Sequence, residues 1–163
     1  MKRKQSTQQS YVISVSLGKG CYRHIRICAN DTLKMLSDAL LAVFSFDNDH
    51  QHAFFMDNKL WSHGRAFFVE KDGPWEQTTY SVHLCQLGLP IGAKFKYLFD
   101  FGDEWPFQCR VLKLIDEPTK EAVVIRSIGE APEQYEEYDD CFEAICDEAG
   151  WNEERDGATL SFH

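Results

Sequence analysis

Two segments of the chain carry side chains that could do chemistry. His50 and His52 stand two residues apart, which places both imidazoles on one face of an extended chain. Asp100 and Asp103 stand around a second short segment, and two imidazoles with carboxylates can bind a transition metal or serve as acid and base. A metal-dependent or acid–base enzyme is therefore one hypothesis, and it requires these four side chains to meet in space.

Simpler interpretations exist for both segments. Gly102-Asp103 suits a tight turn, and the two histidines suit a polar loop between a helix and a strand. The favoured hypothesis is a non-enzymatic binding or interaction module without cofactor or metal, whose partner is a protein or a small ligand. Its expected groove borders the 97–105 hairpin and uses Arg23, His50, His52, Tyr97, Asp100, Asp103 and Trp105.

Other motifs of catalysis are incomplete or missing. Asp100-Phe101-Gly102 matches the magnesium-binding tripeptide of kinases, but neither a glycine-rich phosphate loop nor an H-R-D segment accompanies it. The sequence contains no G-x-S-x-G motif and no C-x-x-C pair among its 6 cysteines. We therefore expect reduced thiols that mostly serve as small core residues.

Length and composition predict one globular domain. The chain has 163 residues, of which 44% are hydrophobic and 13% are aromatic, which is enough apolar surface for a core. Residues 1–10 are expected to be a disordered tail and residues 11–163 a single domain. No apolar run follows the basic start at Met1 to Lys4, so a cytoplasmic location is expected, with no membrane association.

Charge is unevenly distributed along the sequence. The segment from Glu130 to Asp156 carries 12 acidic residues and one basic residue, whereas the rest of the chain has a net charge of +2. A negative field repels phosphates. Nucleic acid is therefore not expected as a partner, and no salt-sensitive binding to duplex DNA is predicted at physiological salt.

Hydrophobic periodicity predicts the elements. Alternating apolar residues predict strands; the expected ranges are 11–17, 22–28, 52–56, 59–62, 94–101, 105–115 and 122–128. Leu33, Leu36, Leu40 and Val43 recur at helical spacing after a cap at Asp31 or Thr32. A short helical turn is expected at 80–87, a loop at 63–77, and an acidic helix that begins at Pro132.

These elements predict an α+β fold. We expect a mixed or antiparallel sheet of about five to seven strands. The helix from Leu33 to Phe44 should pack on one face of this sheet. Phe95, Tyr97, Phe99 and Phe101 should share one face of their strand, and Asp100 should point to the other.

Three ordered segments resemble one family. Tyr22-Arg23-His24-Ile25 is similar to W-R-R-I, Phe46 to Phe54 is similar to G-W-x-x-x-H-x-H-x-F, and Tyr97 to Trp105 is similar to Y-x-Y-D-F-G-D-x-W. From about Tyr11 to Asp140 the chain thus resembles the plasmid pRi ORF-three-like family, some members of which carry the label TnpR. The resemblance implies a plasmid- or mobile-element-associated protein, and a DNA-associated accessory protein is a third hypothesis.

The sequence departs from the family pattern at two places. Phe107 stands where the family usually has His, and Ala131 to Glu136 replaces a P-P-E-D-C-G-G stretch. If the family uses those residues in a site, this chain lacks them.

Overall fold

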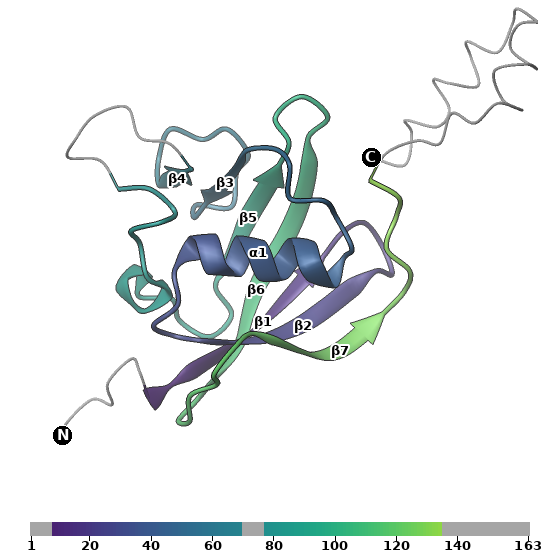
Figure 1. The fold of residues 1–163 in the computed structure, drawn as a ribbon. Coiled ribbons are helices and arrows are strands. Elements are labelled where there is room, and N and C mark those ends of the chain that lie inside the picture. Colours follow the sequence, from purple (N-terminus) through teal and green to yellow (C-terminus); the bar gives the residue numbers. More distant parts are fainter. Residues whose placement is uncertain (1–7, 70–76, 135–163) are drawn as a thin grey trace, which may run out of the picture. The chain divides into compact units, whose positions relative to one another are not determined.

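The structure, a computed structural model, describes residues 8–69 and 77–134. Its elements in chain order are β1 (Ser10–Ser16), β2 (Tyr22–Cys28), α1 (Leu33–Val43), β3 (His52–Phe55), β4 (Ala66–Phe68), the 3-10 helix η2 (Leu84–Leu87), β5 (Lys94–Phe99), β6 (Trp105–Ile115) and β7 (Val123–Ile128) (Figure 1). The seven strands form one sheet in the order β4-β3-β5-β6-β1-β2-β7. Every pairing between neighbours is antiparallel.

The predicted α+β class is wrong, because the described part of the chain is mainly β with a single α-helix. The strand count and the antiparallel alternative were predicted correctly. The expected acidic helix does not begin at Pro132, since residues 132–134 are not helical, and the rest of that segment lies outside the described residues. The chain divides into two compact units, Met1–Ala131 and Pro132–His163, and the sheet belongs to the first.

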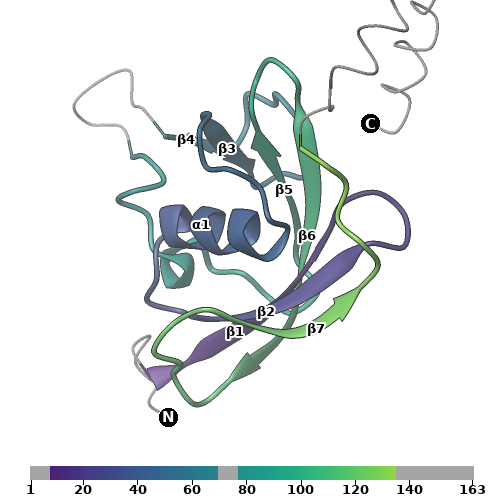
Figure 2. The same ribbon diagram turned by 45° about the vertical axis from the view of Figure 1, so that its right-hand side comes forward.

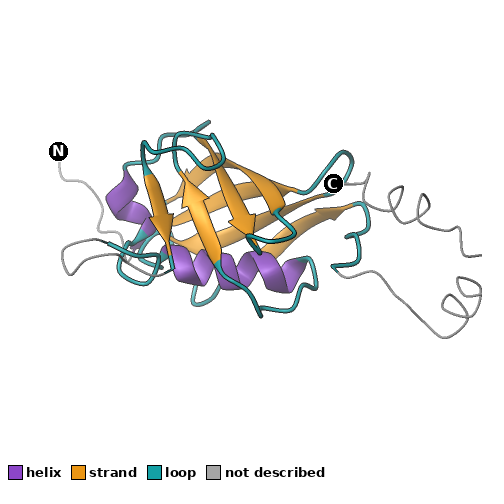
Figure 3. Ribbon diagram, turned by 90° about the horizontal axis from the view of Figure 1, so that it is seen from above, coloured by secondary structure: helices purple, strands orange, loops and turns teal. Residues whose placement is uncertain are grey.

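Helix α1 covers one face of the sheet, as its apolar stripe predicted (Figures 2 and 3). Leu33, Leu36 and Leu40 are fully buried and pack in the same core cluster as the inward residues of β1, β2, β5 and β6. The first N–H groups of the helix have no partner within the helix and need acceptors outside its hydrogen-bond ladder. Thr32 caps it by accepting a hydrogen bond from the N–H of Met35, 3.2 Å away.

The partner of β3 lies further along the chain than predicted. Lys59 to Ser62 is not a strand, and β3 pairs instead with Ala66–Phe68, inside the segment expected to be a loop. Asn58 and Trp61 have positive φ angles, which turn the chain back over the sheet. The side chains of this segment join a second apolar cluster on the face opposite α1, formed by Ala53, Phe55, Leu60, Ala66, Phe68, Leu98 and Phe101.

The 97–105 hairpin differs from its prediction at one residue. Strand β5 ends at Phe99, and Asp100 takes a φ of 68°. This left-handed residue reverses the alternation, so Phe101 packs in the cluster opposite α1, whereas Phe95, Tyr97 and Phe99 face the helix. The prediction that all four aromatic residues share one face is wrong for Phe101.

Within the described residues, no helix combines the length and apolar character needed to cross a membrane.

Candidate functional site

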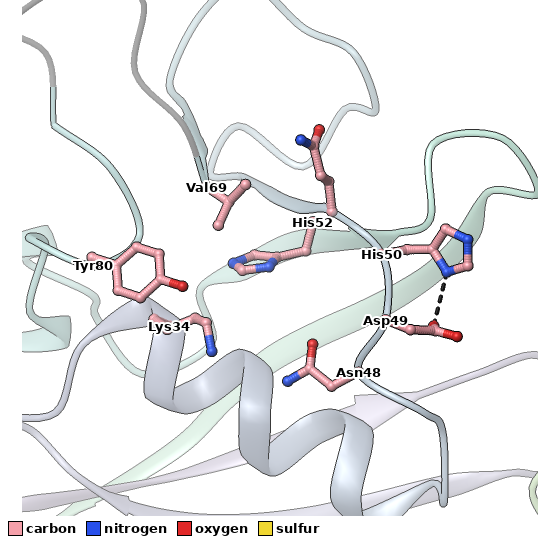
Figure 4. A pocket seen from close by; sticks show the side chains of 8 residues that line it. Lys34, Asn48, Asp49, His50, His52, Val69 and Tyr80 are labelled. Carbon is pink, nitrogen blue, oxygen red and sulfur yellow. Dashed lines mark hydrogen bonds and ion pairs between the residues drawn. The ribbon is translucent and has the colours of Figure 1, made fainter.

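A pocket of about 590 Å³ lies where α1, the segment entering β3, and Tyr80 meet (Figure 4). Its lining is mostly polar. The residues are Lys34 from the helix, Asn48, Asp49, His50, Gln51 and His52 from one continuous stretch, and Val69 and Tyr80 from the segment between β4 and η2.

His52 forms the buried wall of this pocket. It is the first residue of β3 and pairs with Phe99, and only 2% of its surface is exposed. Its Nε2 lies 3.0 Å from the hydroxyl of Thr79, and its ring lies against Tyr97 at a centroid distance of 5.7 Å. Burial, with a smaller contribution from the charge of Lys34, lowers the pKa of His52 to about 4. The imidazole is therefore neutral near pH 7.

Thr79 is positioned by two backbone hydrogen bonds to separate elements. Its N–H donates to the carbonyl of Phe68 at 3.0 Å, and its carbonyl accepts from the N–H of Lys34 at 2.8 Å. These bonds connect the end of β4 to the first turn of α1, where helix N–H groups have no partner inside the helix. The residue that contacts His52 is thus fixed by the fold.

The rim of the pocket contains a chain of polar contacts. Lys34 Nζ lies 2.6 Å from Asp38 Oδ1, and the same oxygen accepts a hydrogen bond from Asn48 Nδ2 at 2.8 Å. The ammonium of Lys34 also lies 5.4 Å from the centre of the Tyr80 ring, within cation–π distance. The positive charge of the rim is consequently balanced by a neighbouring carboxylate.

His50 lies at the opposite side of the pocket. Figure 4 shows its ring turned away from His52 and beside Asp49, whose Oδ1 is 2.8 Å from His50 Nδ1. Asp100 Oδ2 is 3.6 Å from the same nitrogen. The hydrogen bond with Asp49 and the nearby carboxylates raise the pKa of His50, whereas its slight burial opposes them.

Asp100 has a structural part in the hairpin turn. Its Oδ1 accepts hydrogen bonds from the N–H groups of Gly102 at 3.1 Å and Asp103 at 3.2 Å. Its own N–H donates to the carbonyl of Gln51 at 2.8 Å, which joins the hairpin to the segment that lines the pocket. This bond places the segment that lines the pocket next to the 97–105 hairpin, although no residue of the hairpin lines the pocket itself.

The four side chains of the enzyme hypothesis do not converge. His50 lies beside Asp100, but His52 points to Thr79, and Asp103 is exposed on the turn. Among the described residues, no group of three or more His, Cys, Asp or Glu side chains could hold a metal ion.

Three further residues predicted for the groove lie in the interior. Arg23 is buried, donates to the carbonyls of Tyr22 and Ile128 at 3.0 and 2.9 Å, and stacks over Phe44. Tyr97 is fully buried, and its hydroxyl lies 2.6 Å from that of Ser37. Trp105 is buried with its ring edge-on to a phenylalanine of the core. None of the three lines the pocket.

Sequence reasoning missed Lys34, Asn48 and Tyr80. The pairing of Lys34 with Asp38 at helical spacing and the polar stretch at 47–52 were the available signals. Tyr80 had no signal in the sequence, because its place over the helix depends on the hydrogen bonds of Thr79.

Comparison with known proteins gives the family. The profile of the plasmid pRiA4b ORF-3-like protein family matches residues 9–159, which is most of the chain. This chain belongs to that family. The resemblance seen in the three sequence segments is thereby confirmed, and the match extends beyond them at both ends.

Comparison with structures supports the fold of this ORF-3-like protein. The crystal structure of MM3350, a protein of unknown function from Methanosarcina mazei Go1, superposes with a TM-score of 0.63 and 22% sequence identity, over 77% of this chain and 72% of that one. Comparison with curated proteins finds no match. Neither similarity carries the TnpR label.

Phe107, which stands where the family usually has His, lies in the core of this ORF-3-like protein. Phe107 is fully buried and packs against Phe44 and Tyr97, each at a centroid distance of 5.3 Å. A side chain at this position thus faces the core and α1, away from solvent. The second departure lies at Ala131 to Gln134 within the described residues and continues beyond them.

Proposed function

We propose that this ORF-3-like protein is a non-enzymatic binding module that takes a small polar ligand in the pocket between α1 and β3. The observation that carries the proposal is a pocket whose buried wall is a neutral imidazole and whose rim holds an aromatic ring. Its volume of about 590 Å³ is in the range of small-molecule sites, which are typically about 300–1,000 Å³. A cytoplasmic location is part of this proposal.

The charges of the pocket favour a neutral or zwitterionic ligand. Lys34 is paired with Asp38, and His50 is paired with Asp49, so neither sign dominates the lining. The side-chain oxygen of Asn48 can accept a hydrogen bond, the neutral ring of His52 forms the buried wall, and the ring of Tyr80 offers a flat apolar surface. A ligand with amide or hydroxyl groups beside a flat ring satisfies these features.

The walls of the pocket are held before any ligand arrives. Thr79 ties the segment of Tyr80 to α1, and Asp38 ties Asn48 to the same helix. Such preorganisation supports binding, because little conformational freedom is lost when the ligand enters.

The acid–base alternative has weaker support. It needs His50, His52, Asp100 and Asp103 to act on one reacting atom. His50 and Asp100 lie within 3.6 Å of each other, but His52 faces the other way and is engaged by Thr79. The geometry therefore favours binding over proton transfer by this set.

Ligand-observed NMR with a fragment library of amides, polyols and amino-acid-like compounds tests the proposal. Fragments that bind the wild-type protein should lose about tenfold in affinity with Tyr80→Ala, as expected when an aromatic contact of about 1.4 kcal/mol is removed. Asn48→Ala should weaken the same fragments. Ile91→Ala, an exposed residue outside the pocket, is the control. Fragment binding that both pocket variants leave unchanged would contradict the proposal.

A further inference from the structure

The sheet carries charge of only one sign. None of the seven strands contains Asp or Glu, although the chain as a whole has 26 acidic residues. Six Lys or Arg side chains lie in the strands besides the buried Arg23, and they are Arg26, Lys94, Lys96, Arg110, Lys113 and Arg126. The acidic residues of the described chain are in the helix, turns and loops.

The strand register gathers these cations on the face opposite α1. Phe95, Cys109, Val15 and Ile25 face the helix, so their neighbours along each strand face the other way. Lys94 pairs with Arg110, Arg110 with Ser14, Ser14 with His24, and His24 with Arg126. These five residues form one row across β5, β6, β1, β2 and β7, which we call the basic row.

A second row runs parallel to the basic row. Lys96, Gln108, Ser16, Tyr22 and Ile128 are opposite one another across the same five strands. The Nζ of Lys96 donates a hydrogen bond to Gln108 Oε1. Lys113 extends the face on the other side of the basic row, where it lies opposite Val12.

The basic row is unfavourable for folding. Like charges on directly opposite residues destabilise a sheet, and Lys94 faces Arg110 in this way. Burial lowers the pKa of His24, and the charge of Arg126 lowers it further. Within the described residues, no carboxylate forms an ion pair with Lys94, Arg110 or Arg126, and all three are exposed. An anionic partner would relieve this repulsion.

The middle of this face has features that suit nucleotide bases. Tyr22 and His24 are half-buried, and their rings stack at a centroid distance of 5.3 Å and an interplanar angle of 29°. Ser14 and Ser16 on the neighbouring strand are small, so an extended chain can approach β1 between the cations. Aromatic rings among cations on an open sheet are a recurring platform for single-stranded nucleic acid.

We propose that the open face built around the basic row binds single-stranded nucleic acid. Lys94, Arg110 and Arg126 contact phosphates, and Tyr22 and His24 stack with bases. An acidic protein segment would satisfy the cations but would leave the aromatic pair without a function, so a nucleic acid is the better fit. The net charge of −9 does not oppose this, because the acidic excess falls at residues 130–156 of the sequence, whereas the strands contain no Asp or Glu. This inference departs, for single strands, from the expectation that nucleic acid is not a partner.

Fluorescence anisotropy with labelled oligo(dT) and oligo(U) of about 16 nucleotides tests the inference. Both probes should bind at low salt, and the affinity should fall as salt rises, because phosphate contacts release counterions. A preference for oligo(U) would identify RNA as the natural source of the strand, and equal affinity would indicate recognition through features that both strands share. A duplex of the same length should bind more weakly, since its bases are not available to Tyr22 and His24.

Two variants separate charge from stacking. Lys94→Gln with Arg110→Gln should weaken binding about tenfold or more and reduce the slope of log affinity against log salt by about 1.4, since each phosphate contact contributes about 0.7. Tyr22→Ala should weaken binding about fivefold or more without changing that slope. Tyr22→Phe, which keeps an aromatic ring, should bind with nearly the affinity of the wild type.

The control variant removes the same number of positive charges at positions away from the basic row. Lys19→Gln with Lys120→Gln removes two exposed cations from turns and should leave affinity and slope close to those of the wild type. The Lys94 and Arg110 variant should also unfold at the same temperature or higher, which separates loss of binding from loss of fold. Equal weakening by both double variants, no binding of either probe at low salt, or tighter binding of polyglutamate than of the oligonucleotides would each overturn the inference.

Discussion

His52 combines a polar ring with an almost complete exclusion from water. Burying an imidazole is tolerable only in its neutral form, and the hydroxyl of Thr79 supplies the hydrogen bond that this form needs. The charge of Lys34 adds to the preference for the neutral ring, and that of Asp38 opposes it. The wall of the pocket is consequently uncharged near pH 7. The burial of His52 also makes the fold sensitive to acid.

This sensitivity can be measured. The folded pKa of about 4 lies below the ordinary 6.5, so the unfolded chain binds the proton first as pH falls. The free energy of unfolding should therefore fall by about 2 kcal/mol between about pH 7 and about pH 5, as the unfolded chain takes up the proton that the buried His52 excludes. Urea unfolding of the wild type and of His52→Gln, which cannot titrate, gives the difference. Parallel pH profiles for the two proteins would contradict the assignment.

At the scale of single residues, the directions of the candidate side chains could not be predicted from the sequence. The spacing of His50 and His52 predicted that both side chains share one groove, but their directions depend on where β3 begins. Since β3 begins at His52, that ring enters the ladder opposite Phe99, whereas His50 remains in the preceding loop. Thr79 is 27 residues away, and no local pattern could have indicated its contact with His52.

Among the elements, those with long and regular patterns were predicted well. The alternation in β1, β2 and β6 and the stripe of α1 gave boundaries within one or two residues of the structure. Strand β4 was missed because it has three residues, too few for a period to be recognised. The end of β5 was misplaced because Asp100 adopts a positive φ, a conformation that periodicity does not reveal.

The buried stripe of α1 gives a prediction for this element. Leu36→Ala and Leu40→Ala should each destabilise the fold by about 2–5 kcal/mol, because both side chains are fully buried against the sheet and their truncation leaves a cavity. Met35→Ala, on the exposed side of the same helix, should change stability by about 0.5 kcal/mol or less. Chemical denaturation measures all three. An unchanged midpoint for either leucine variant would show that the stripe is not core.

The backbone at the end of β7 packs closely against the turn between β1 and β2. Gly129 has a φ of 82°, and a Cβ built on it would lie 2.0 Å from the carbonyl oxygen of Gly20. Gly18 has a similar φ of 75°, but a Cβ there would meet nothing within 4 Å. The two glycines therefore differ in crowding, although they share the same backbone strain.

This contrast predicts unequal effects of the same substitution. Gly18→Ala should destabilise by about 1–2 kcal/mol, the strain of a left-handed alanine. Gly129→Ala should destabilise by more, because the backbone of β7 or of the turn must also move. Thermal unfolding of both variants makes the comparison, and similar losses would show that the end of β7 can move away at little cost.

For the whole molecule, the distribution of charge matters more than its sum. Cations line one sheet face, the acidic side chains of the described residues lie in α1, turns and loops, and the pocket near α1 is nearly balanced. The net charge of −9 describes none of these surfaces. Sequence composition could give the total, but the rows that create a surface exist only once the register of five strands is set.

The cysteines give a prediction that spans the molecule. Cys21 and Cys109 are buried, and burial raises the pKa of the Cys109 thiol, whereas Cys85 is partly exposed. Iodoacetamide should therefore modify Cys85 in the native protein well before Cys21 or Cys109, because only an accessible thiolate reacts. Mass spectrometry of digested peptides follows each site, and denaturant should equalise the rates. Early labelling of Cys109 in the native state would mean that the core opens readily.

The place of β6 in the sheet has a consequence for synthesis on the ribosome. β6 lies between β5 and β1, and its register joins residues as distant as Ser10 and Ile115. Until Trp105–Ile115 has emerged, the nascent chain can form only two separate ladders, β1-β2 and β4-β3-β5, each with an unpaired edge next to apolar side chains. Folding of the sheet must therefore wait until residue 115 has been translated, and a nascent chain that stalls earlier exposes apolar edges that chaperones bind.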